Sequence, residues 1–466
     1  MNTFKMLING RLEDGFAELE VVNPATEEVL AMAPRASKAQ LNAAVAAAKA
    51  AFPAWSALSI DARKKHLGAI ADILQAHADE LGRLLTQEQG KPLADAMGEA
   101  NGLAGMFRYF SKFDLAPELV EETDKRKVEL RRRPLGVVAL IVPWNFPLII
   151  LGSKVPPALL AGNTIVLKPA PTTPLATLRF AELIKDVLPP GVLNVITDAN
   201  DLGAELTRHP DVRKISFTGS SGTGKKVMSS AAETIKRVTL ELGGNDAGIV
   251  LDDADPKTAA PGIFNGAFRN SGQVCIAMKR LYVHESIYDQ MCEELAALAQ
   301  KAVVGDGLEQ GTQFGPLQNR MQFEKVREIL EDARQHGTVL EGGNVPDKGY
   351  FIRPTIVRDI EDGTRLVDEE QFGPVLPVIK YSDPEDALAR ANASPYGLGA
   401  SVWSSNPDRT MALAERVEAG TVWINKHSEL AAHIPFGGAK ESGIGVEMGE
   451  EGLAEFTQLQ VINAAR

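Results

Sequence analysis

Short apolar pieces alternate with turn-forming residues over the first part of the chain, from residue 5 to residue 30. The turns are marked by the pairs Asn9-Gly10, Asp14-Gly15 and Asn23-Pro24. Short runs bounded by such pairs are typical of extended segments joined in hairpins. We therefore expect strands here rather than helices.

Helical spacing begins after Ser37. This serine and Gln40, three residues later, match a capping box, and the apolar positions that follow recur at helical steps until Pro53 interrupts them. A second helix is expected from about residue 61 to residue 87. Its predicted apolar face is formed by Leu67, Ile70, Leu74, His77 and Leu81.

From Gly136 the pattern changes to short apolar runs separated by stretches with helical spacing. The first series contains the runs 136–142, 163–169, 191–196 and 214–219. A second series after residue 275 contains the runs 279–285, 350–357, 374–381, 397–404 and 420–426, with a helical stretch at 288–303. Strand, helix and strand in succession predict a parallel sheet. The expected fold class is therefore α/β, with two α/β units.

Composition narrows the class of protein. A chain of 466 residues exceeds what one hydrophobic core usually supports, and 44% hydrophobic with 24% charged residues is typical of an ordinary globular protein. The net charge of −12 argues against nucleic acid as a partner, although a local basic site can still bind one anionic cofactor. The longest apolar run, 136–142, is too short to cross a bilayer, so we expect no membrane segment.

The cysteines and histidines show no metal-ligand spacing. The two cysteines, Cys275 and Cys292, form no C-x-x-C pair, and the histidines form no H-E-x-x-H motif, so no metal site is expected. Absence of a disulfide framework favours a reducing compartment, by default the cytoplasm. His427 and His433 flank a loop and could touch a substrate, but we expect exposed loop histidines.

Cys275 lies in the segment 268–280, close after a glycine. A cysteine there is either a buried apolar residue, the commoner outcome, or a nucleophile on a turn whose backbone N–H groups stabilise an oxyanion. Upstream, Glu241 ends an apolar run before two glycines, and Asn145 lies between two prolines in PWNFP. Thiol, carboxylate and amide together could supply a nucleophile, a base and an oxyanion donor.

A glycine-rich turn follows the run 214–219, from Gly219 through Ser220 and Gly224 to Lys226. Strand, glycine turn and helix can bind phosphate, because backbone N–H groups at the helix N-terminus point at the anion. The nucleoside-triphosphate loop is rejected, since Lys226 stands where Ser or Thr would hold a metal, and no G-x-G-x-x-G with a ribose-binding acid is present. A mere turn remains the alternative. Likewise Lys168, at the end of a strand-like run, could reach a ribose or phosphate or could simply be solvated.

Seven motifs occur in one order: PWNFP, KPAPTTP, FTGSSGTG, LELGGND, SGQVC, EEQFGPV and PFGGAKESGIG. Together they resemble the NAD(P)-dependent, hydrolytic aldehyde dehydrogenases over nearly the whole chain. The resemblance implies a Rossmann-like parallel-sheet cofactor domain, an α/β catalytic domain and a small β extension for oligomerisation. It assigns residues 1–115 and 135–243 to NAD(P) binding, 244–446 to catalysis, and 116–134 and 447–466 to strands that pair subunits in a homodimer or homotetramer.

The same resemblance implies roles for individual residues. Cys275 would be the nucleophile, Glu241 the general base that activates water to hydrolyse a thioester, and Asn145 the oxyanion donor together with the Cys275 N–H. NAD or NADP would accept the hydride. The implied cofactor contacts are Trp144, Lys168, Gly219, Ser220, Gly224, Glu370 and Phe372.

One departure concerns the cofactor. Many NAD-preferring members carry a glutamate three positions after the lysine of the KP motif, where it binds the ribose hydroxyls and repels a 2′-phosphate. Pro171 stands at that position here. The repulsion is therefore absent, and use of NADP is permitted without being demanded.

The substrate is expected to be a small aldehyde, contacted by Arg269, Phe146, Ile276 and Phe436. Members that oxidise succinate semialdehyde resemble this chain in having FRN around Arg269, whose guanidinium would bind the distal carboxylate. A second arginine of those enzymes is replaced by Ser153. A structural ion pair of Arg269 is the alternative.

Two other classes remain open from the residues alone. A cysteine hydrolase or thioesterase would use the same thiol and carboxylate without a cofactor. A non-catalytic binding protein would keep the fold alone, although all three catalytic residue types are present.

Overall fold

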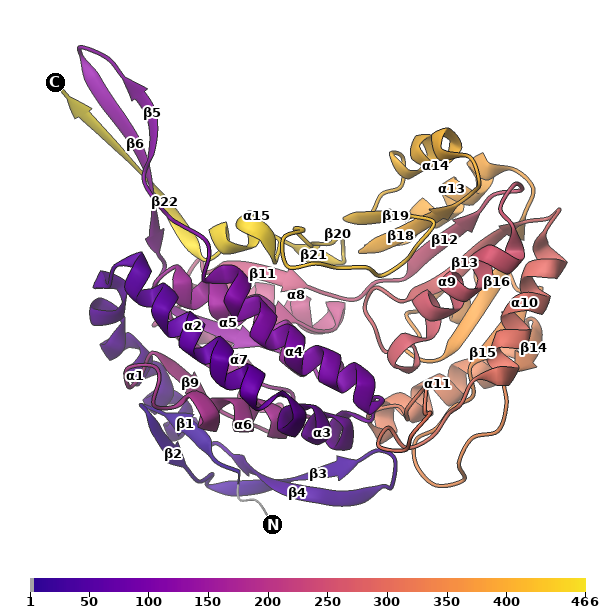
Figure 1. The fold of residues 1–466 in the computed structure, drawn as a ribbon, viewed down its shortest axis with the longest axis horizontal. Helices are drawn as coiled ribbons and strands as arrows, with labels where there is room; N and C mark the ends of the chain where they lie inside the picture. Colours follow the sequence, from indigo (N-terminus) through magenta and orange to yellow (C-terminus); the bar gives the residue numbers. More distant parts are fainter. Residues whose placement is uncertain (1–3) are drawn as a thin grey trace.

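The structure is a computed structural model and describes residues 4–466. Two β-sheets form its frame (Figure 1). The first has eight strands in the order β2 (Arg11–Glu13), β1 (Met6–Ile8), β9 (Leu193–Val195), β8 (Thr164–Lys168), β7 (Val137–Ile141), β10 (Val212–Thr218), β11 (Arg237–Glu241) and β21 (Gly443–Ile444). The strands from β9 to β11 run parallel, whereas β2, β1 and β21 pair antiparallel. This topology confirms the α/β class and the first series of strands.

Helices cover the first sheet, and α4 packs against α2, α3 and α5. Their bounds are α1 (Lys38–Ala57), α2 (Ile60–Ala76), α3 (Ala78–Gln89), α4 (Leu93–Phe110), α5 (Pro147–Leu160), α6 (Leu175–Ile184), α7 (Gly203–Arg208) and α8 (Ser221–Ala232). The hairpin of β3 (Ala17–Asn23) and β4 (Glu28–Arg35) lies at the edge of this half (Figure 1). Together with the β1–β2 hairpin, it confirms the strands expected in residues 5–30.

The second sheet has seven strands and lies in the other half of the molecule. Their order is β14 (Thr338–Glu341), β15 (Thr355–Arg358), β16 (Val375–Tyr381), β13 (Met278–His284), β12 (Asp246–Val250), β18 (Gly399–Trp403) and β19 (Thr421–Ile424), all parallel to their neighbours except β14. Its helices are α9 (Pro256–Phe268), α10 (Tyr288–Lys301), α11 (Arg320–Ala333), α12 (Arg365–Asp368), α13 (Pro384–Asn392) and α14 (Pro407–Ala414). Two short strands, β17 (Tyr396–Gly397) and β20 (Ala439–Lys440), pair separately.

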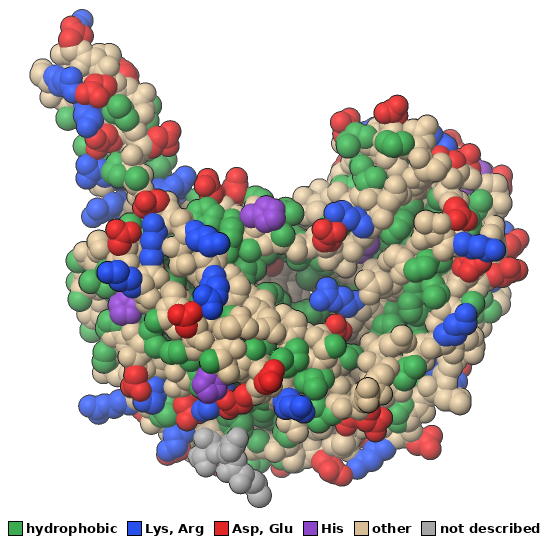
Figure 2. Space-filling model, viewed as in Figure 1, with side chains coloured by type: hydrophobic (Ala, Val, Ile, Leu, Met, Phe, Trp, Pro, Cys, Tyr) green, Lys and Arg blue, Asp and Glu red, His purple; other side chains and the backbone are tan. Residues whose placement is uncertain are grey.

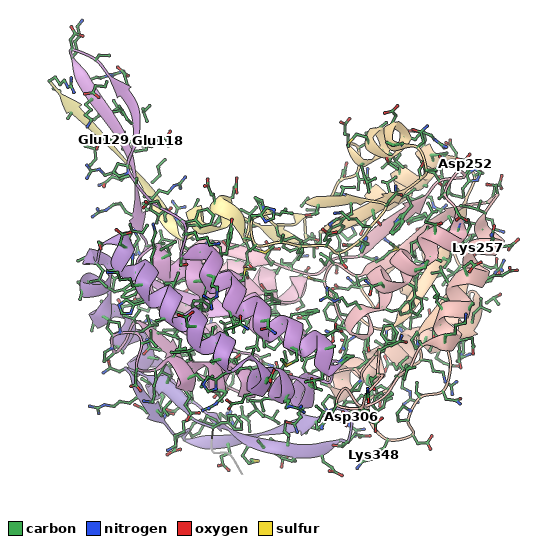
Figure 3. All side chains as sticks on the ribbon, viewed as in Figure 1. Glu118, Glu129, Asp252, Lys257, Asp306 and Lys348 are labelled. Carbon is green, nitrogen blue, oxygen red and sulfur yellow. The ribbon has the colours of Figure 1, made fainter. Side chains whose placement is uncertain are left out.

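A three-stranded antiparallel sheet projects from the first half and carries the C-terminus near its tip (Figure 1). We call it the arm; it consists of β5 (Glu118–Glu122), β6 (Arg126–Pro134) and β22 (Thr457–Ala465), which follows α15 (Gly449–Ala454). Figure 3 shows Glu118 and Glu129 on the arm, and Figure 2 shows the hollow between the arm and the second half. Its exposed apolar side chains include Leu119, Val120, Leu459, Val461 and Ile462.

The capping box at the first helix is confirmed, whereas the predicted helix ends are not. The Ser37 side chain accepts the Gln40 N–H at 3.2 Å, and the Gln40 side chain accepts the Ser37 N–H at 3.0 Å. The expected interruption at Pro53 is wrong, because α1 continues to Ala57. The proline removes one backbone donor, and the buried face around Trp55 holds the last turn in place.

The single helix expected over residues 61–87 is wrong, because the structure has two helices, α2 and α3, that meet at His77. His77 has non-helical ψ of 15°, and its N–H still bonds to the Ile73 carbonyl at 3.1 Å. Its ring faces outward and contacts Glu80 at 2.9 Å instead of joining the apolar face. Within residues 4–466 no single helix is long and apolar enough to cross a membrane; α1 and α2 pass that test only as a pair, bent by 119°.

A buried network fastens the segment before α15 to the first half. Glu447 lies between the Lys154 ammonium, the Ser153 hydroxyl at 2.6 Å and the Ser216 hydroxyl at 3.3 Å. The lysine also donates to Ser216 at 2.8 Å. Lys154 is fully buried, so its charge depends on Glu447 for compensation.

We predict that Glu447→Ala lowers stability by about 3–5 kcal/mol, because it leaves the Lys154 ammonium buried without its carboxylate. The control is Glu441→Ala, which removes a solvent-exposed ion pair with Lys225 and should cost about 1 kcal/mol or less. Thermal and urea unfolding, followed by circular dichroism, measure both variants. Equal losses in the two variants would contradict the expected role of the buried pair.

Candidate active site

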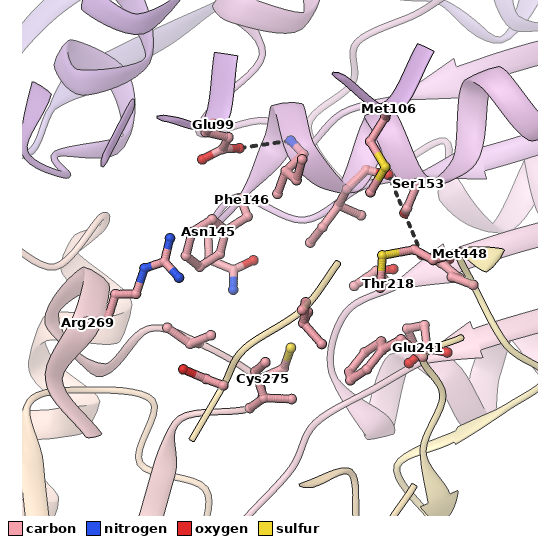
Figure 4. A pocket seen from close by; sticks show the side chains of 18 of the residues that line it. Glu99, Met106, Asn145, Phe146, Ser153, Thr218, Glu241, Arg269, Cys275 and Met448 are labelled. Atoms are coloured by element: carbon pink, nitrogen blue, oxygen red, sulfur yellow. Dashed lines mark hydrogen bonds between the residues drawn. The ribbon is translucent and has the colours of Figure 1, made fainter. Parts of the chain in front are cut away.

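The predicted catalytic and substrate-binding residues line one cavity of about 320 Å³ (Figure 4). The catalytic candidates Asn145, Glu241 and Cys275 are joined there by Phe146, Arg269, Ile276 and Phe436. Residues that the sequence did not single out complete the wall; they include the apolar Met106, Ile149, Ile150, Val274, Leu430 and Met448 and the polar Asp95, Glu99, Thr218, Ser428 and Glu447. Such a cavity suits a small molecule with an apolar body and few polar groups.

Strand register in the first sheet explains why distant residues meet. Lys168 pairs with Ile141 at the ends of β8 and β7, and Glu241 pairs with Thr218 at the ends of β11 and β10. The loop that carries Asn145 follows β7 at the same edge. The carboxyl edge of parallel strands is where open α/β sheets bind ligands.

A buried ion pair, Lys91 with Glu99, stabilises the loop that carries Asn145. The Lys91 ammonium contacts Glu99 at 2.5 Å, donates to the Asn145 carbonyl at 2.9 Å and lies 3.7 Å from the centre of the Phe146 ring. Glu99 in turn accepts the N–H groups of Leu148 and Ile149 at the start of α5, at 2.8 and 3.1 Å. No local pattern in the sequence indicates these contacts, because Asn145 and Leu148 lie about fifty residues after Lys91 and Glu99.

The turn before Cys275 has an unusual backbone. Asn270, Ser271 and Gly272 have φ values of 50°, 55° and 73°, in the left-handed region that costs free energy for residues with a side chain. A Cβ on Gly272 would lie 2.2 Å from the Gly373 carbonyl oxygen, so only glycine fits. This turn presents the half-buried Cys275 to the cavity.

Two hydrogen bonds join Asn145 to the loop that carries Cys275. The Asn145 side-chain amide donates to the Gln273 carbonyl at 2.9 Å, and the Asn270 amide donates back to the Asn145 carbonyl at 3.2 Å. Figure 4 shows the amide of Asn145 and the sulfur of Cys275 pointing toward the same space. An amide N–H there is placed to bind oxygen on a carbon attached to the sulfur.

Burial raises the pKa of the Cys275 thiol to about 12, and only Lys279 among the neighbouring charges lowers it. The carboxyl groups of Asp246, Glu370 and Glu241 raise the pKa further. Like charges near a thiolate disfavour its formation, whereas an ammonium favours it. The thiol therefore depends on Lys279 for its positive neighbour.

Glu241 is a buried carboxyl whose two oxygens have no hydrogen-bond partner in the part of the chain that the structure describes. Burial, with a contribution from the negative charge of Glu447, raises the pKa of Glu241 well above its usual range. A carboxylate with a raised pKa holds a proton more strongly, which is the property that a general base needs near neutral pH.

The predicted cofactor residues form a second group beside the cavity. Gly219 and Ser220 lie at the N-terminus of α8, where the Ser220 side chain accepts the Thr223 N–H at 3.4 Å. Lys168 is buried and donates to Asp198 at 2.6 Å. Gly224 is buried against Leu242, where a Cβ would come within 2.5 Å, so it allows the helix to pack closely on the strand end.

Glu370, Phe372 and Trp144 complete this group from both halves. Glu370 accepts the Gly244 N–H at 3.1 Å, and Phe372 meets Trp144 edge to face at 5.5 Å between ring centres. An ammonium and a helix N-terminus from the first half, together with a carboxylate from the second half, fit a nicotinamide dinucleotide, because they match its hydroxyl and phosphate groups. Among residues 4–466, no group of three or more His, Cys, Asp or Glu side chains could hold a metal ion.

Arg269 does not form, with any residue that the structure describes, the structural ion pair that was the alternative to substrate binding. Arg269 is exposed at the rim, 5.9 Å from the centre of the Phe146 ring, and no carboxylate of residues 4–466 lies within ion-pair distance of it.

The expectation of an exposed loop His427 is wrong. Its ring is buried between the Ile276 carbonyl, at 3.0 Å, and the Ser401 hydroxyl, at 2.9 Å, and burial lowers its pKa to about 3. His433 is exposed, as predicted.

A thiol after a strained turn, an amide aimed at the same space and a buried carboxyl without a hydrogen-bond partner in residues 4–466 suit covalent chemistry at sulfur. The aldehyde dehydrogenase family model matches residues 12–462. The chain belongs to the aldehyde dehydrogenase family.

Similar proteins match this chain over nearly its whole length. The chain is 41% identical over 473 residues to a phenylacetaldehyde dehydrogenase from Pseudomonas fluorescens, covering 97% of this chain and 94% of that protein. It is 40% identical over 468 residues to a mitochondrial succinate-semialdehyde dehydrogenase from Arabidopsis thaliana, covering 98% and 88%. A betaine aldehyde dehydrogenase from Staphylococcus aureus, solved with NAD⁺, superposes with a TM-score of 0.95 at 33% identity, covering 99% and 94%.

The family and these neighbours establish the general activity. The protein is an oxidoreductase that oxidises an aldehyde to a carboxylic acid with NAD or NADP as cofactor. The open alternatives of a cofactor-free hydrolase and a non-catalytic protein of the same fold are therefore set aside.

Proposed function

We propose that Cys275 is the nucleophile, Asn145 the oxyanion donor and Glu241 the general base of this oxidation. The observation that carries the proposal is their convergence in one cavity, with the Asn145 amide bonded to the loop of Cys275. The Cys275 sulfur adds to the aldehyde carbon, and the oxygen is stabilised by the Asn145 amide and the Cys275 N–H. The nicotinamide, when bound, accepts a hydride from that carbon. Glu241 then takes a proton from the water that hydrolyses the thioester.

We infer the cofactor contacts from the second group of residues. Gly219 and Ser220 would bind the pyrophosphate, Lys168 the adenosine ribose and Glu370 the nicotinamide ribose, with Phe372 near the nicotinamide and Trp144 lining the adjoining backbone. Gly224 would contribute through the close packing of α8. Pro171 offers no charge against a 2′-phosphate, which supports use of both NAD and NADP.

Residues 1–115 and 135–243 would form the cofactor domain and residues 244–446 the catalytic domain. The arm, from 116–134 and 447–466, would pair subunits in a homodimer or homotetramer, because its long edge strands expose apolar side chains. Two unbridged cysteines support a reducing compartment such as the cytoplasm.

For the substrate, we propose a short aldehyde with a distal carboxylate. The support is Arg269, whose guanidinium is at the rim of the cavity without a carboxylate partner in residues 4–466. A planar guanidinium binds a carboxylate through two hydrogen bonds. The apolar wall around Met106, Ile149 and Met448 favours a second candidate, an uncharged aliphatic or aromatic aldehyde.

We predict that Cys275→Ala abolishes dehydrogenase turnover and leaves cofactor binding nearly intact, because only the covalent step uses the thiol. Turnover is measured by absorbance of reduced nicotinamide, and binding by calorimetric titration. The matched control is Cys292→Ala, in which a buried cysteine of α10 is removed and turnover should persist. Substantial turnover of Cys275→Ala would reject the assigned nucleophile.

We predict that Glu241→Gln slows thioester hydrolysis more than hydride transfer, because an amide cannot take a proton from water. A pre-steady-state burst of reduced cofactor should persist in stopped-flow measurements while the steady rate falls by about 10²-fold or more. Loss of the burst together with the steady rate would instead place Glu241 in the first chemical step.

We predict that the unmodified enzyme prefers a short ω-carboxylate semialdehyde over its uncharged analogue of equal length, and that Arg269→Ala erases this preference. The loss in kcat/KM for the charged substrate should be about 1.5 kcal/mol, near the low end for a charged hydrogen bond because Arg269 is exposed. Lys257→Ala, which removes a distant surface charge on α9, is the control (Figure 3). Equal kcat/KM for the two substrates in the unmodified enzyme would favour the uncharged candidate.

A further inference from the structure

Lys279, at the start of β13, has no role in the assignments above, yet its ammonium contacts the nucleophile loop directly. It donates to the Cys275 carbonyl at 2.6 Å and to the Val274 carbonyl at 2.9 Å. The residue is 1% exposed, so these bonds are made in a site from which water is excluded. Two carbonyls held by one ammonium restrict the peptide planes on either side of the cysteine.

The same ammonium faces Glu370 across the boundary between the two groups of site residues. Its nitrogen lies 3.4 Å from a Glu370 carboxylate oxygen and 5.7 Å from the centre of the Phe372 ring. A buried ammonium has three N–H groups, and two carbonyls with one carboxylate can satisfy all three. Lys279 thus joins the nucleophile loop to a residue assigned to the cofactor.

The charges facing the thiol come from four segments. Asp246 on β12, Glu241 on β11 and Glu370 after α12 are acidic, and Lys279 on β13 is the basic group. Burial raises the pKa of Asp246 to about 8, so this carboxyl is largely neutral near pH 7. His427 packs behind Ile276, and its lowered pKa keeps it uncharged.

We propose that Lys279 is a positioning residue that holds the Cys275 peptide in place and supplies the positive charge that favours the thiolate. Glu370 opposes the second effect, because its carboxylate lies against the same ammonium. Removal of Lys279 and removal of the Glu370 charge must therefore change the ionisation of Cys275 in opposite directions. A lysine that only filled space and satisfied carbonyls would not produce this pair of effects.

The test measures the thiol without cofactor or substrate. The full-length protein is alkylated with iodoacetamide at pH 8, and modification of the Cys275 peptide is followed by mass spectrometry, which separates it from Cys292. At this pH, far below the pKa of the thiol, the alkylation rate is proportional to the fraction of thiolate. Lys279→Met should slow alkylation of Cys275 by about tenfold or more. Glu370→Gln, which keeps an acceptor for the Gly244 N–H, should accelerate it.

Two further variants separate charge from damage to the fold. Lys279→Arg keeps the charge and should leave the alkylation rate close to that of the unmodified protein. Lys214→Met removes another fully buried lysine, paired with Glu455 at 3.3 Å, and should lower thermal stability without changing the alkylation rate of Cys275. A decrease in rate with Lys214→Met as large as that with Lys279→Met would overturn the proposal, as would an unchanged rate in folded Lys279→Met.

If Lys279→Met fails to fold, Glu370→Gln decides, because an unchanged or lowered alkylation rate in that variant would also overturn the proposal. The inference rests on Cys275 being the nucleophile of the proposed function. Alkylation nevertheless reports thiol ionisation independently of turnover. If the alkylation test fails, the Cys275→Ala result still decides whether Cys275 is the nucleophile. If the Cys275→Ala test fails, the alkylation rates still report the ionisation of the thiol.

Discussion

The cost of burying charge is the constraint on which this site depends. Lysines without access to water surround the cavity, and each is paired with a carboxylate: Lys91 with Glu99, Lys154 with Glu447, and Lys279 with Glu370. Breaking a buried pair leaves a charge without compensation and costs several kcal/mol, so each pair allows one arrangement of the segments that carry it. The Asn145 loop, the segment before α15 and the Cys275 loop are fixed by these three pairs.

The same constraint acts differently on Glu241, which has no partner for either oxygen among residues 4–466. Burial penalises its charged form without any hydrogen bond to offset the penalty, and its pKa rises. The neighbouring Glu447 contacts a lysine and two hydroxyl groups. The two carboxyl groups in one cavity wall therefore differ in their hydrogen-bond partners, and burial raises the pKa of Glu241.

Local patterns in the sequence predicted the elements whose causes are local. The Ser37–Gln40 capping box formed as expected, and the alternating series of apolar runs gave most of the parallel strands of both sheets, although β11 and β12 were not among those runs. Motif order predicted the family, and the cavity contains every catalytic and substrate candidate. The roles of individual residues stay predictions until variants are measured.

The wrong predictions and the contacts that were not predicted depend on tertiary packing between segments far apart in the sequence. Pro53 lies within α1 because the buried face of the helix outweighs one lost donor, and the break at His77 follows from packing that periodicity does not encode. Burial of His427 depends on Ile276, 151 positions earlier in the chain. Glu447 meets its lysine across 293 positions, so no window of sequence could indicate that contact.

The distance between Cys275 and Asn145 is set by a short reciprocal link between their loops rather than by the two sheets. The Asn145 amide holds the Gln273 carbonyl, and the Asn270 amide holds the Asn145 carbonyl, which also receives the Lys91 ammonium. Each loop is therefore positioned by the other, although one follows β7 of the first sheet and the other precedes β13 of the second. A hinge motion between the halves would have to break these buried hydrogen bonds before it could separate Cys275 from Asn145, and unpaired buried groups would make that state costly. Movement that admits or releases a ligand is consequently expected in the exposed wall around Arg269 rather than at the reacting atoms.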